Sequence, residues 1–272
     1  MTTLSVALVQ LDARGEVERN VEAAVALADE AASASRFVLL PEYLQYRGPD
    51  DGYRASARPV PGPFTAPFAA VASRRDAWIL LGSLAETSAD PARPYNTSVL
   101  IAPDGSIAAT YRKLHLFDVS IASGPSDLES ARVSAGDRRV VASVDRARVG
   151  LSICYDLRFP ELYRALALDG AEILTVPASF TERTGRDHWE VLLRARAIEN
   201  AAYVLAPGQI GHPPGSPASF GRSMIVDPWG VVVAQAPDRI GIVRAELDLG
   251  RVADIRAQIP ALRHRRPEAY GA

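Results

Sequence analysis

Three side chains with different reactive groups follow predicted apolar strands in this sequence: Glu42, Lys113 and Cys154. Cys154 is the only cysteine and Lys113 the only lysine among the 272 residues. A thiolate is a nucleophile, an ammonium can stabilise the oxyanion that forms at an attacked carbonyl, and a carboxylate can act as a general base. Because side chains at strand ends meet at the rim of an α/β sheet, the set predicts acyl-transfer chemistry at one site.

Each of the three residues also has an ordinary structural interpretation. A lone cysteine is often a buried core residue, a lysine is often a surface charge, and a glutamate after a strand is often a solvated strand end. The preference for arginine over lysine and the abundance of alanine also indicate the codon bias of a GC-rich genome. The residues by themselves therefore leave both a catalytic and a structural interpretation open.

Alternating helical and strand patterns indicate the elements that carry these residues. Helices are predicted over residues 17–34 and 65–75, from Pro160 onward, from the capping-box pattern Asp187-x-x-Glu190 to about residue 200, and over 248–258. Strands are predicted over residues 4–11, 37–40, 78–82, 97–102, 107–112, 140–144, 149–153, 171–176, 202–206, 223–226, 231–234 and 240–246. Residues 47–63 and 118–137 are predicted to be loops. Hairpins interrupt the alternation, so we expect an α/β layered sandwich with mixed sheets in one domain, residues 1–272.

The composition argues against several classes of function. A net charge of −2 provides no basic surface for nucleic acid, and no apolar run reaches the roughly 18 residues of a membrane helix. With one cysteine and no signal-peptide pattern, we expect a cytoplasmic protein, in which the sequon Asn96-Thr97-Ser98 has no meaning. The histidines lack metal-ligand spacing and no Gly-rich phosphate loop occurs, so we expect no metal and no cofactor.

Several longer segments contain these residues, and in this order the chain resembles the nitrilase superfamily of carbon–nitrogen hydrolases over nearly its whole length. Lys113 follows Glu42 by 71 residues and Cys154 follows Lys113 by 41. The segments are Leu-Pro-Glu42, Tyr-Arg-Lys113-Leu-His-Leu-Phe-Asp118, Cys154-Tyr-Asp-Leu-Arg-Phe-Pro-Glu161-Leu, His188-Trp-Glu-Val-Leu-Leu-Arg-Ala-Arg-Ala-Ile-Glu-Asn200, Ser223-Met-Ile-Val-Asp-Pro-Trp-Gly230 and His264-Arg-Arg-Pro-Glu-Ala-Tyr270.

The resemblance implies a four-layer αββα sandwich with two mixed sheets and a homodimer or higher homo-oligomer. Because the pI is acidic, the tail Arg263-His264-Arg265-Arg266 is interpreted as a docking segment at a subunit contact rather than a nucleic-acid patch. The resemblance also implies a Glu-Lys-Cys triad, in which Glu42 is the general base, Lys113 the oxyanion stabiliser and Cys154 the nucleophile that forms a thioester. The backbone N–H of Tyr155 would complete the oxyanion hole. A second glutamate, Glu129, would orient Lys113, with Asp127 as the alternative.

Within the superfamily the chain is similar to the Nit-type amidases. Its Phe159-Pro160-Glu161 segment and its tail favour the deaminated glutathione amidases, which implies a small carboxylate-bearing amide as substrate. One departure is Pro177-Ala178-Ser179-Phe180, where that branch has Pro-Ser-Ala-Phe. The alternatives are an ω-amidase acting on α-ketoglutaramate-type substrates, a nitrilase, carbamoylase or acyltransferase with the same triad, and a silent binding protein. Candidate substrate-binding residues are Tyr155, Ser179, Phe180 and His188.

Overall fold

The computed structural model describes residues 3–120 and 126–270 and is built around two six-stranded mixed sheets. The first sheet has the order β16-β1-β2-β3-β4-β5. Its strands are β1 (Thr3–Gln10), β2 (Phe37–Leu39), β3 (Trp78–Glu86), β4 (Tyr95–Ile101), β5 (Ile107–Arg112) and β16 (Gly241–Asp248). Strands β1, β2 and β3 run parallel, whereas β16, β4 and β5 join by antiparallel pairing. The predicted strands of this half of the chain are therefore present.

The second sheet has the order β15-β14-β11-β10-β9-β8. Its strands are β8 (Val140–Val144), β9 (Ala147–Leu151), β10 (Ile173–Thr175), β11 (Tyr203–Ala206), β14 (Met224–Val226) and β15 (Val232–Gln235). The central strands β9, β10 and β11 are parallel; β10 and β11 are fully buried, and β9 is buried except at Arg148. Strand β9 ends at Leu151, two residues earlier than predicted, so the chain leaves the sheet before it reaches Cys154.

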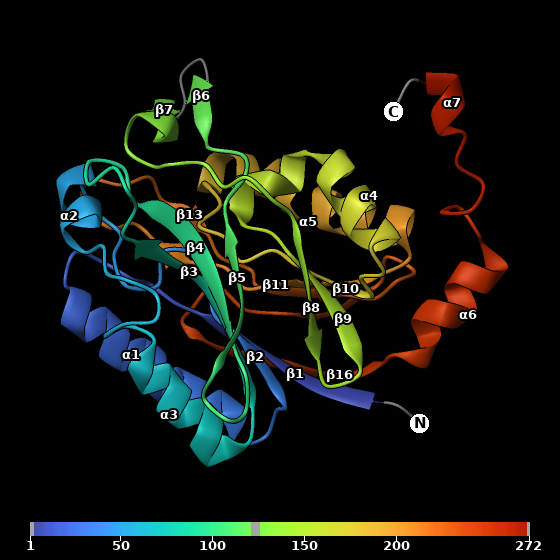
Figure 1. Ribbon diagram of the computed structural model, residues 1–272, viewed down its shortest axis with the longest axis horizontal. Coiled ribbons are helices and arrows are strands. Elements are labelled where there is room, and N and C mark those ends of the chain that lie inside the picture. Colours follow the sequence, from blue (N-terminus) through green and yellow to red (C-terminus); the bar gives the residue numbers. More distant parts are fainter. Residues whose placement is uncertain (1–2, 121–125, 271–272) are drawn as a thin grey trace.

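Alternation along the strands divides the apolar side chains between two cores. In β1, Leu4, Val6 and Leu8 belong to the core between the two sheets, while Ala7 and Val9 belong to the core beneath helices α1 (Val17–Ala32) and α3 (Ala66–Arg75). On the other side, α4 (Pro160–Leu168) and α5 (Glu182–Asn200) cover the second sheet (Figure 1). The expected four-layer αββα sandwich is confirmed.

The beginning of α5 differs from the sequence prediction. The helix begins at Glu182 after an extended Thr181, so the capping-box pattern that starts at Asp187 lies inside the helix and His188 does not open it. Gly185 is a helix residue for a packing reason, since a Cβ there would lie 2.5 Å from the Cβ of Phe220. The capping-box prediction was wrong because this tertiary contact, which local sequence does not reveal, favours glycine inside the helix.

Both segments predicted to be loops contain short elements. Helix α2 (Asp50–Ala55) lies in the first, and the second contains the paired strands β6 (Asp118–Ser120) and β7 (Ser126–Leu128) and the 3₁₀ helix η1 (Glu129–Ala131). Residues 121–125 of that predicted loop lie outside the described residues. A further short pair is formed by β12 (Ile210–Gly211) and β13 (Ser219–Phe220). Elements of two to six residues are too short to produce a detectable period.

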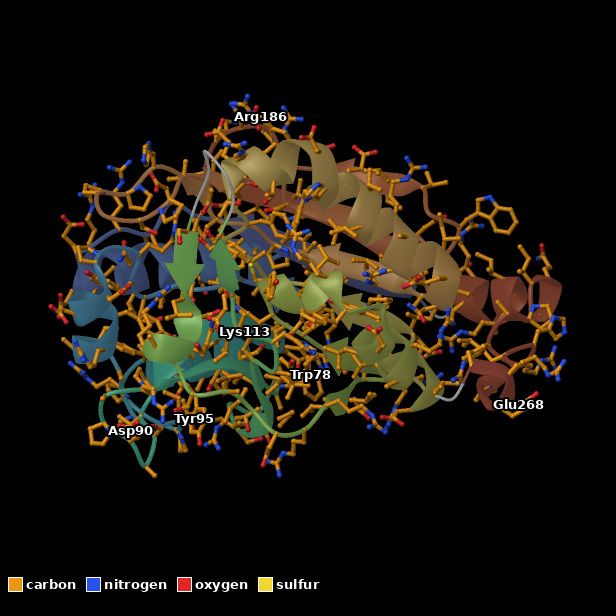
Figure 2. The ribbon with its side chains drawn as sticks, turned by 90° about the horizontal axis from the view of Figure 1, so that it is seen from above. Trp78, Asp90, Tyr95, Lys113, Arg186 and Glu268 are labelled. Atoms are coloured by element: carbon orange, nitrogen blue, oxygen red, sulfur yellow. The ribbon has the colours of Figure 1, made fainter. Side chains whose placement is uncertain are left out.

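The C-terminal part continues through α6 (Gly250–Gln258) and α7 (Pro267–Tyr270), which lie at the side of the sandwich in Figure 1. Figure 2 shows Lys113 inside the molecule, whereas Asp90, Arg186 and Glu268 lie at its periphery. Within residues 3–120 and 126–270, none of the helices has the length and apolar character that crossing a membrane requires.

Candidate active site

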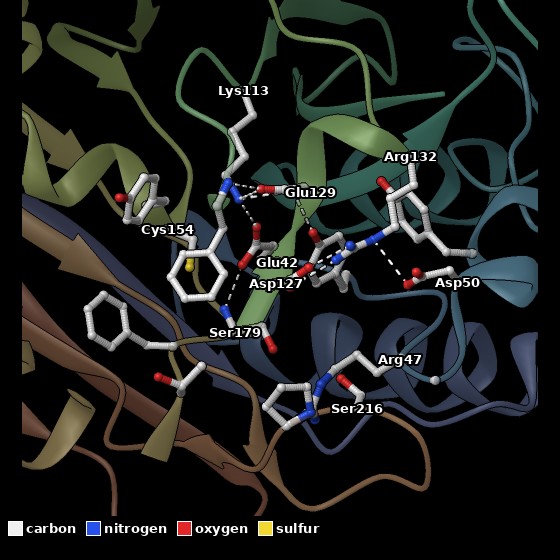
Figure 3. A pocket seen from close by; sticks show the side chains of 18 of the residues that line it. Glu42, Arg47, Asp50, Lys113, Asp127, Glu129, Arg132, Cys154, Ser179 and Ser216 are labelled. Atoms are coloured by element: carbon white, nitrogen blue, oxygen red, sulfur yellow. Dashed lines mark hydrogen bonds and ion pairs between the residues drawn. The ribbon is translucent and has the colours of Figure 1, made fainter. Parts of the chain in front are cut away.

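The three reactive residues occupy loops just beyond the ends of strands. Glu42 lies three residues after β2, Lys113 directly follows β5, and Cys154 is the first residue of the 3₁₀ helix η2 (Cys154–Arg158), three residues after β9. Strands β2 and β5 belong to the first sheet and β9 to the second, so the two sheets must stack for these side chains to meet. Figure 3 shows them gathered at one pocket.

Lys113 lies between two carboxylates. Its Nζ is 3.0 Å from Oε1 of Glu42 and 2.9 Å from Oε2 of Glu129 (Figure 3). The side chains are almost completely buried, with 2% of Lys113 and 1% of each glutamate exposed. Burial by itself lowers the pKa of Lys113, but the negative charges of Glu129 and Glu42 outweigh it and raise this pKa well above its ordinary value. The amine is therefore a fixed ammonium at neutral pH.

Glu42 accepts hydrogen bonds on both carboxylate oxygens. Besides Lys113, the Nδ2 of Asn96 donates to Oε1 at 2.9 Å, and the backbone N–H of Ser179 donates to Oε2 at 2.8 Å. Asn96 is fully buried, so the apparent sequon is a site residue and offers no accessible amide. These three donors hold the carboxylate in one orientation, as a positioned general base requires.

Glu129, not Asp127, is the second acidic residue beside Lys113. Its carboxylate also accepts hydrogen bonds from the hydroxyl of Tyr43 at 2.7 Å and from the backbone N–H of Phe117 at 2.6 Å. Burial raises the pKa of Glu129, but Lys113 and these two donors together hold it below its ordinary value. Asp127 instead forms an ion pair with Arg132 at 2.6 Å.

Cys154 adopts a left-handed backbone conformation with φ of +48°. Such a conformation costs about 1–3 kcal/mol in a residue with a side chain and is found where a reactive group must be presented at a sharp turn. Its backbone N–H donates to the carbonyl of Pro177 at 2.9 Å, and the carboxylate of Asp156 accepts the N–H of Ile153 at 2.8 Å. These bonds tie both sides of the turn to the second sheet and η2.

The Cys154 thiol is protonated in its resting state. Burial raises the pKa of Cys154 well above its ordinary value, the carboxylate of Glu42 raises it further, and Lys113 opposes the rise. A neutral thiol can act as a nucleophile only if its proton is transferred to a base during attack.

These residues lie at a cavity of about 270 Å³. Tyr155, Ser179 and Phe180, the first three candidate substrate-binding residues, line it, but His188 does not. His188 instead contacts Arg158, which lines the cavity, with 3.2 Å between Nδ1 and Nη1. In the described part of the chain, no cluster of three or more His, Cys, Asp or Glu residues is arranged to hold a metal ion.

Sequence reasoning missed several residues that complete the site. Tyr43 and Asn96 contact the glutamates directly, and Arg47 and Arg132 line the cavity. Tyr43 follows Glu42 immediately and has a φ of +56°, so the chain turns sharply there too. The position of Tyr43 next to Glu42 in the sequence could have identified Tyr43 as a site residue. For Asn96, the sequence does not distinguish a buried amide from an exposed glycosylation sequon.

Comparison with known proteins gives a consistent result. The family model described as carbon-nitrogen hydrolase matches residues 5–257. The chain is 41% identical over 263 residues to the deaminated glutathione amidase of Synechocystis sp., a match that covers 95% of this chain and 97% of the relative. It is 36% identical over 271 residues to the omega-amidase of Homo sapiens, which covers 99% and 98% of the two chains. The Caenorhabditis elegans NitFhit protein is similar in structure, with a TM-score of 0.90 and 37% identity over 98% of this chain and 66% of that longer one.

Proposed function

Because the chain belongs to the carbon–nitrogen hydrolase family and is an amidase, we propose that it hydrolyses a small carboxylate-bearing amide of the deaminated glutathione type through a thioester on Cys154. The observation that carries this proposal is the buried ammonium of Lys113, held between Glu42 and Glu129 at the cavity that Cys154 also lines. It combines a nucleophile, a base and a fixed positive charge.

In the acylation step, Sγ of Cys154 attacks the amide carbonyl while Glu42 takes the thiol proton. The raised thiol pKa supports this order of events, because a neutral thiol needs a base at the moment of attack. Lys113 and the N–H of Tyr155 stabilise the oxyanion; Tyr155 lies in the first turn of η2, where N–H groups lack intrahelical partners. The carbon–nitrogen bond then breaks, and Glu42 returns the proton to the leaving amine.

Deacylation uses the same groups in the reverse direction. Glu42 removes a proton from water, the resulting hydroxide attacks the thioester carbonyl, and Lys113 again stabilises the oxyanion. The carbon–sulfur bond breaks, the acid leaves, and Cys154 recovers its proton. Glu129 takes no proton in this scheme; its hydrogen bonds to Lys113 keep the ammonium aimed at the oxyanion.

The leading substrate class is deaminated glutathione, named in the relatives at about 40% identity. The alternative is an ω-amidase substrate of the α-ketoglutaramate type, named in a relative at 36% identity. The purified protein should be assayed with deaminated glutathione, α-ketoglutaramate, a simple nitrile and a carbamoyl amino acid. The proposal expects deaminated glutathione to give the highest kcat/KM.

Intact-mass spectrometry tests the mechanism. Protein quenched during turnover should carry an added acyl mass that maps to Cys154, and the Cys154→Ala variant should show neither adduct nor turnover. A wild-type protein that forms no adduct and releases no amine or acid from any member of the panel would instead be a binding protein on the same fold.

We also propose that the protein is a cytoplasmic homodimer. A free reactive thiol suits a compartment in which thiols stay reduced. An apolar groove near α6 supports a subunit contact, because Ile198, Trp229 and Ile259, which line it, are each at least half exposed. Light scattering coupled to gel filtration measures the mass directly, and a monomer at micromolar concentration would refute the dimer.

A further inference from the structure

A chain of hydrogen bonds links the cavity to a buried arginine. The hydroxyl of Ser179, which lines the cavity, lies 2.9 Å from the hydroxyl of Ser219, and Nη2 of Arg47 donates to that second hydroxyl at 2.8 Å. The backbone N–H of Ser179 is used separately, since it donates to Glu42. In Figure 3, Ser179 lies next to Glu42, and Arg47 and Ser216 lie farther along the pocket.

The direction of the protons along this chain follows from elementary chemistry. A guanidinium can only donate, so Ser219 accepts from Arg47. Either hydroxyl of the Ser179–Ser219 pair could donate by geometry, but donation from Ser219 to Ser179 is the arrangement that leaves no buried proton of Ser219 unpaired. Ser179 therefore accepts a hydrogen bond from Ser219. The hydroxyl proton of Ser179 then has no acceptor in the relay, and it is available at the cavity wall for a ligand in the cavity.

The charge at the far end of the chain is poorly compensated. Arg47 has 1% of its side chain exposed, and its nearest carboxylate, Asp12, is 3.6 Å away and already paired with Arg14 at 2.7 Å. Burial lowers the pKa of Arg47 to about 10, which leaves it charged at neutral pH. The negative charges of Asp12 and Glu42 oppose this lowering only in part, and a further negative group in the cavity would be attracted to the guanidinium, which has almost no exposed surface of its own.

The other arginine near the pocket mouth does not share this property. Arg132 is held by two carboxylates, Asp127 at 2.6 Å and Asp50 at 3.1 Å. Its charge is therefore balanced by two carboxylates of the protein. Arg158, the third arginine at the cavity, contacts His188 and lies over the Phe180 ring at 5.2 Å, and the Arg47 side differs from both in reaching the cavity through a chain of hydroxyl groups.

We infer that Arg47, Ser219 and Ser179 form a hydroxyl relay that binds the carboxylate of the amide substrate, with Ser179 as the contacting donor and Arg47 and Ser219 as positioning residues. This inference rests on the proposed function and deepens it, because it says how the cavity selects an anionic amide over a neutral one. Ser179 lies in the Pro177-Ala178-Ser179-Phe180 segment, the departure from the expected Pro-Ser-Ala-Phe order noted above.

A matched pair of substrates tests the relay. Glutaramate and valeramide have the same chain length and the same amide, and they differ only in a terminal carboxylate or methyl group. In the wild-type protein, kcat/KM should be higher for glutaramate. In Ser179→Ala it should fall about ten- to hundredfold for glutaramate, mainly through KM, and less than about threefold for valeramide, because one hydrogen bond to a charged group is lost.

Four further variants separate the relay from general packing. Ser219→Ala leaves Ser179 without its donor, so the glutaramate preference should fall about three- to tenfold. Arg47→Lys keeps a charge at the same depth and should retain more of the preference than Arg47→Met. Ser98→Ala removes another buried hydroxyl, which donates to the carbonyl of Leu81 away from the cavity, and should leave the preference unchanged.

A binding measurement keeps the inference independent of turnover. Calorimetry on Cys154→Ala should show tighter binding of glutaramate than of valeramide, and the double variant Cys154→Ala/Ser179→Ala should lose that difference. Equal affinity for the two amides, or a preference that survives the loss of Ser179, would overturn the relay. If the wild-type protein hydrolyses neither amide but the binding preference and its loss are both seen, the relay stands and the proposed hydrolysis falls.

Discussion

Two clusters at this cavity have the same composition, one cation between two carboxylates, but they differ in exposure. Lys113 with Glu42 and Glu129 is at most 2% exposed, whereas Arg132 is 24%, Asp127 21% and Asp50 67% exposed. In the buried cluster the charges are almost completely removed from solvent, so each charge depends strongly on the others. In the outer cluster, water screens the charges and each pair contributes little. Depth, not composition, separates a reactive site from a surface network.

The largest effect is expected from removing the cation of the buried cluster. Lys113→Met leaves two carboxylates facing each other in the interior, which should cost about 3–5 kcal/mol in the free energy of unfolding measured with urea. Turnover should fall at least about a hundredfold, because one donor to an oxyanion contributes roughly that much or more. Lys113→Arg, which keeps the charge but not the compact shape, should remain folded and still lose most of its turnover. Near wild-type turnover in Lys113→Arg would show that the compact ammonium is not needed.

The next largest effect is expected from removing the charge of Glu129, and Asp127, two residues away, provides the comparison. Glu129→Gln keeps the shape of the side chain but removes the charge next to Lys113, so kcat should fall about ten- to a hundredfold with little change in KM. Asp127→Asn is the matched control at the outer cluster, and its kcat should stay within about threefold of wild type. Equal losses in the two variants would mean that the distinction between the clusters has no catalytic consequence.

The free energy of unfolding should depend on pH through the charged groups of the buried cluster. The pKa of Glu129 is lowered in the folded protein, so its contribution is present above its unfolded pKa of about 4.3 and is lost as the pH falls through the folded value. The pKa of Lys113 is raised, so its contribution is present below about 10.4 and is lost as the pH rises through the folded value. Urea unfolding from pH 3 to 7 should show a shallower acid loss in Glu129→Gln than in wild type. If the free energy of unfolding depended on pH equally in Glu129→Gln and in wild type, Glu129 would not contribute stability through its charged form.

The smallest effect is expected at the outer cluster. Arg132→Gln removes ion pairs to partly exposed carboxylates, so the free energy of unfolding should fall by about 1 kcal/mol or less. The difference from wild type should shrink further in 0.5 M salt, because exposed charges are screened. A loss above about 3 kcal/mol, or one insensitive to salt, would place this cluster in the same energetic class as the buried one.

Sequence reasoning predicted most of the fold because the relevant signals are local. The buried strands are short apolar runs, and α1, α3 and α4 follow their periodicity or, in α4, begin with a proline at the first turn. It failed at the start of α5, where the contact between Gly185 and Phe220 spans 35 residues, and at α2, which has only six residues. The catalytic roles of Glu42, Lys113 and Cys154 remain predictions, although the three side chains line one cavity.

The sequence by itself determined the layered α/β class, the family, and the order and spacing of a carboxylate, an ammonium and a thiol along the chain. Strand periodicity and motif spacing are local features, so they can be identified without the tertiary structure. Only the tertiary structure decided that Glu129 rather than Asp127 faces Lys113, that Asn96 is a buried donor to Glu42, and that Ser179 ends a hydrogen-bond chain from Arg47. These contacts join residues from 16 to 172 positions apart, and their strength depends on burial. Burial is a property of the packed sheets, which no single stretch of sequence contains.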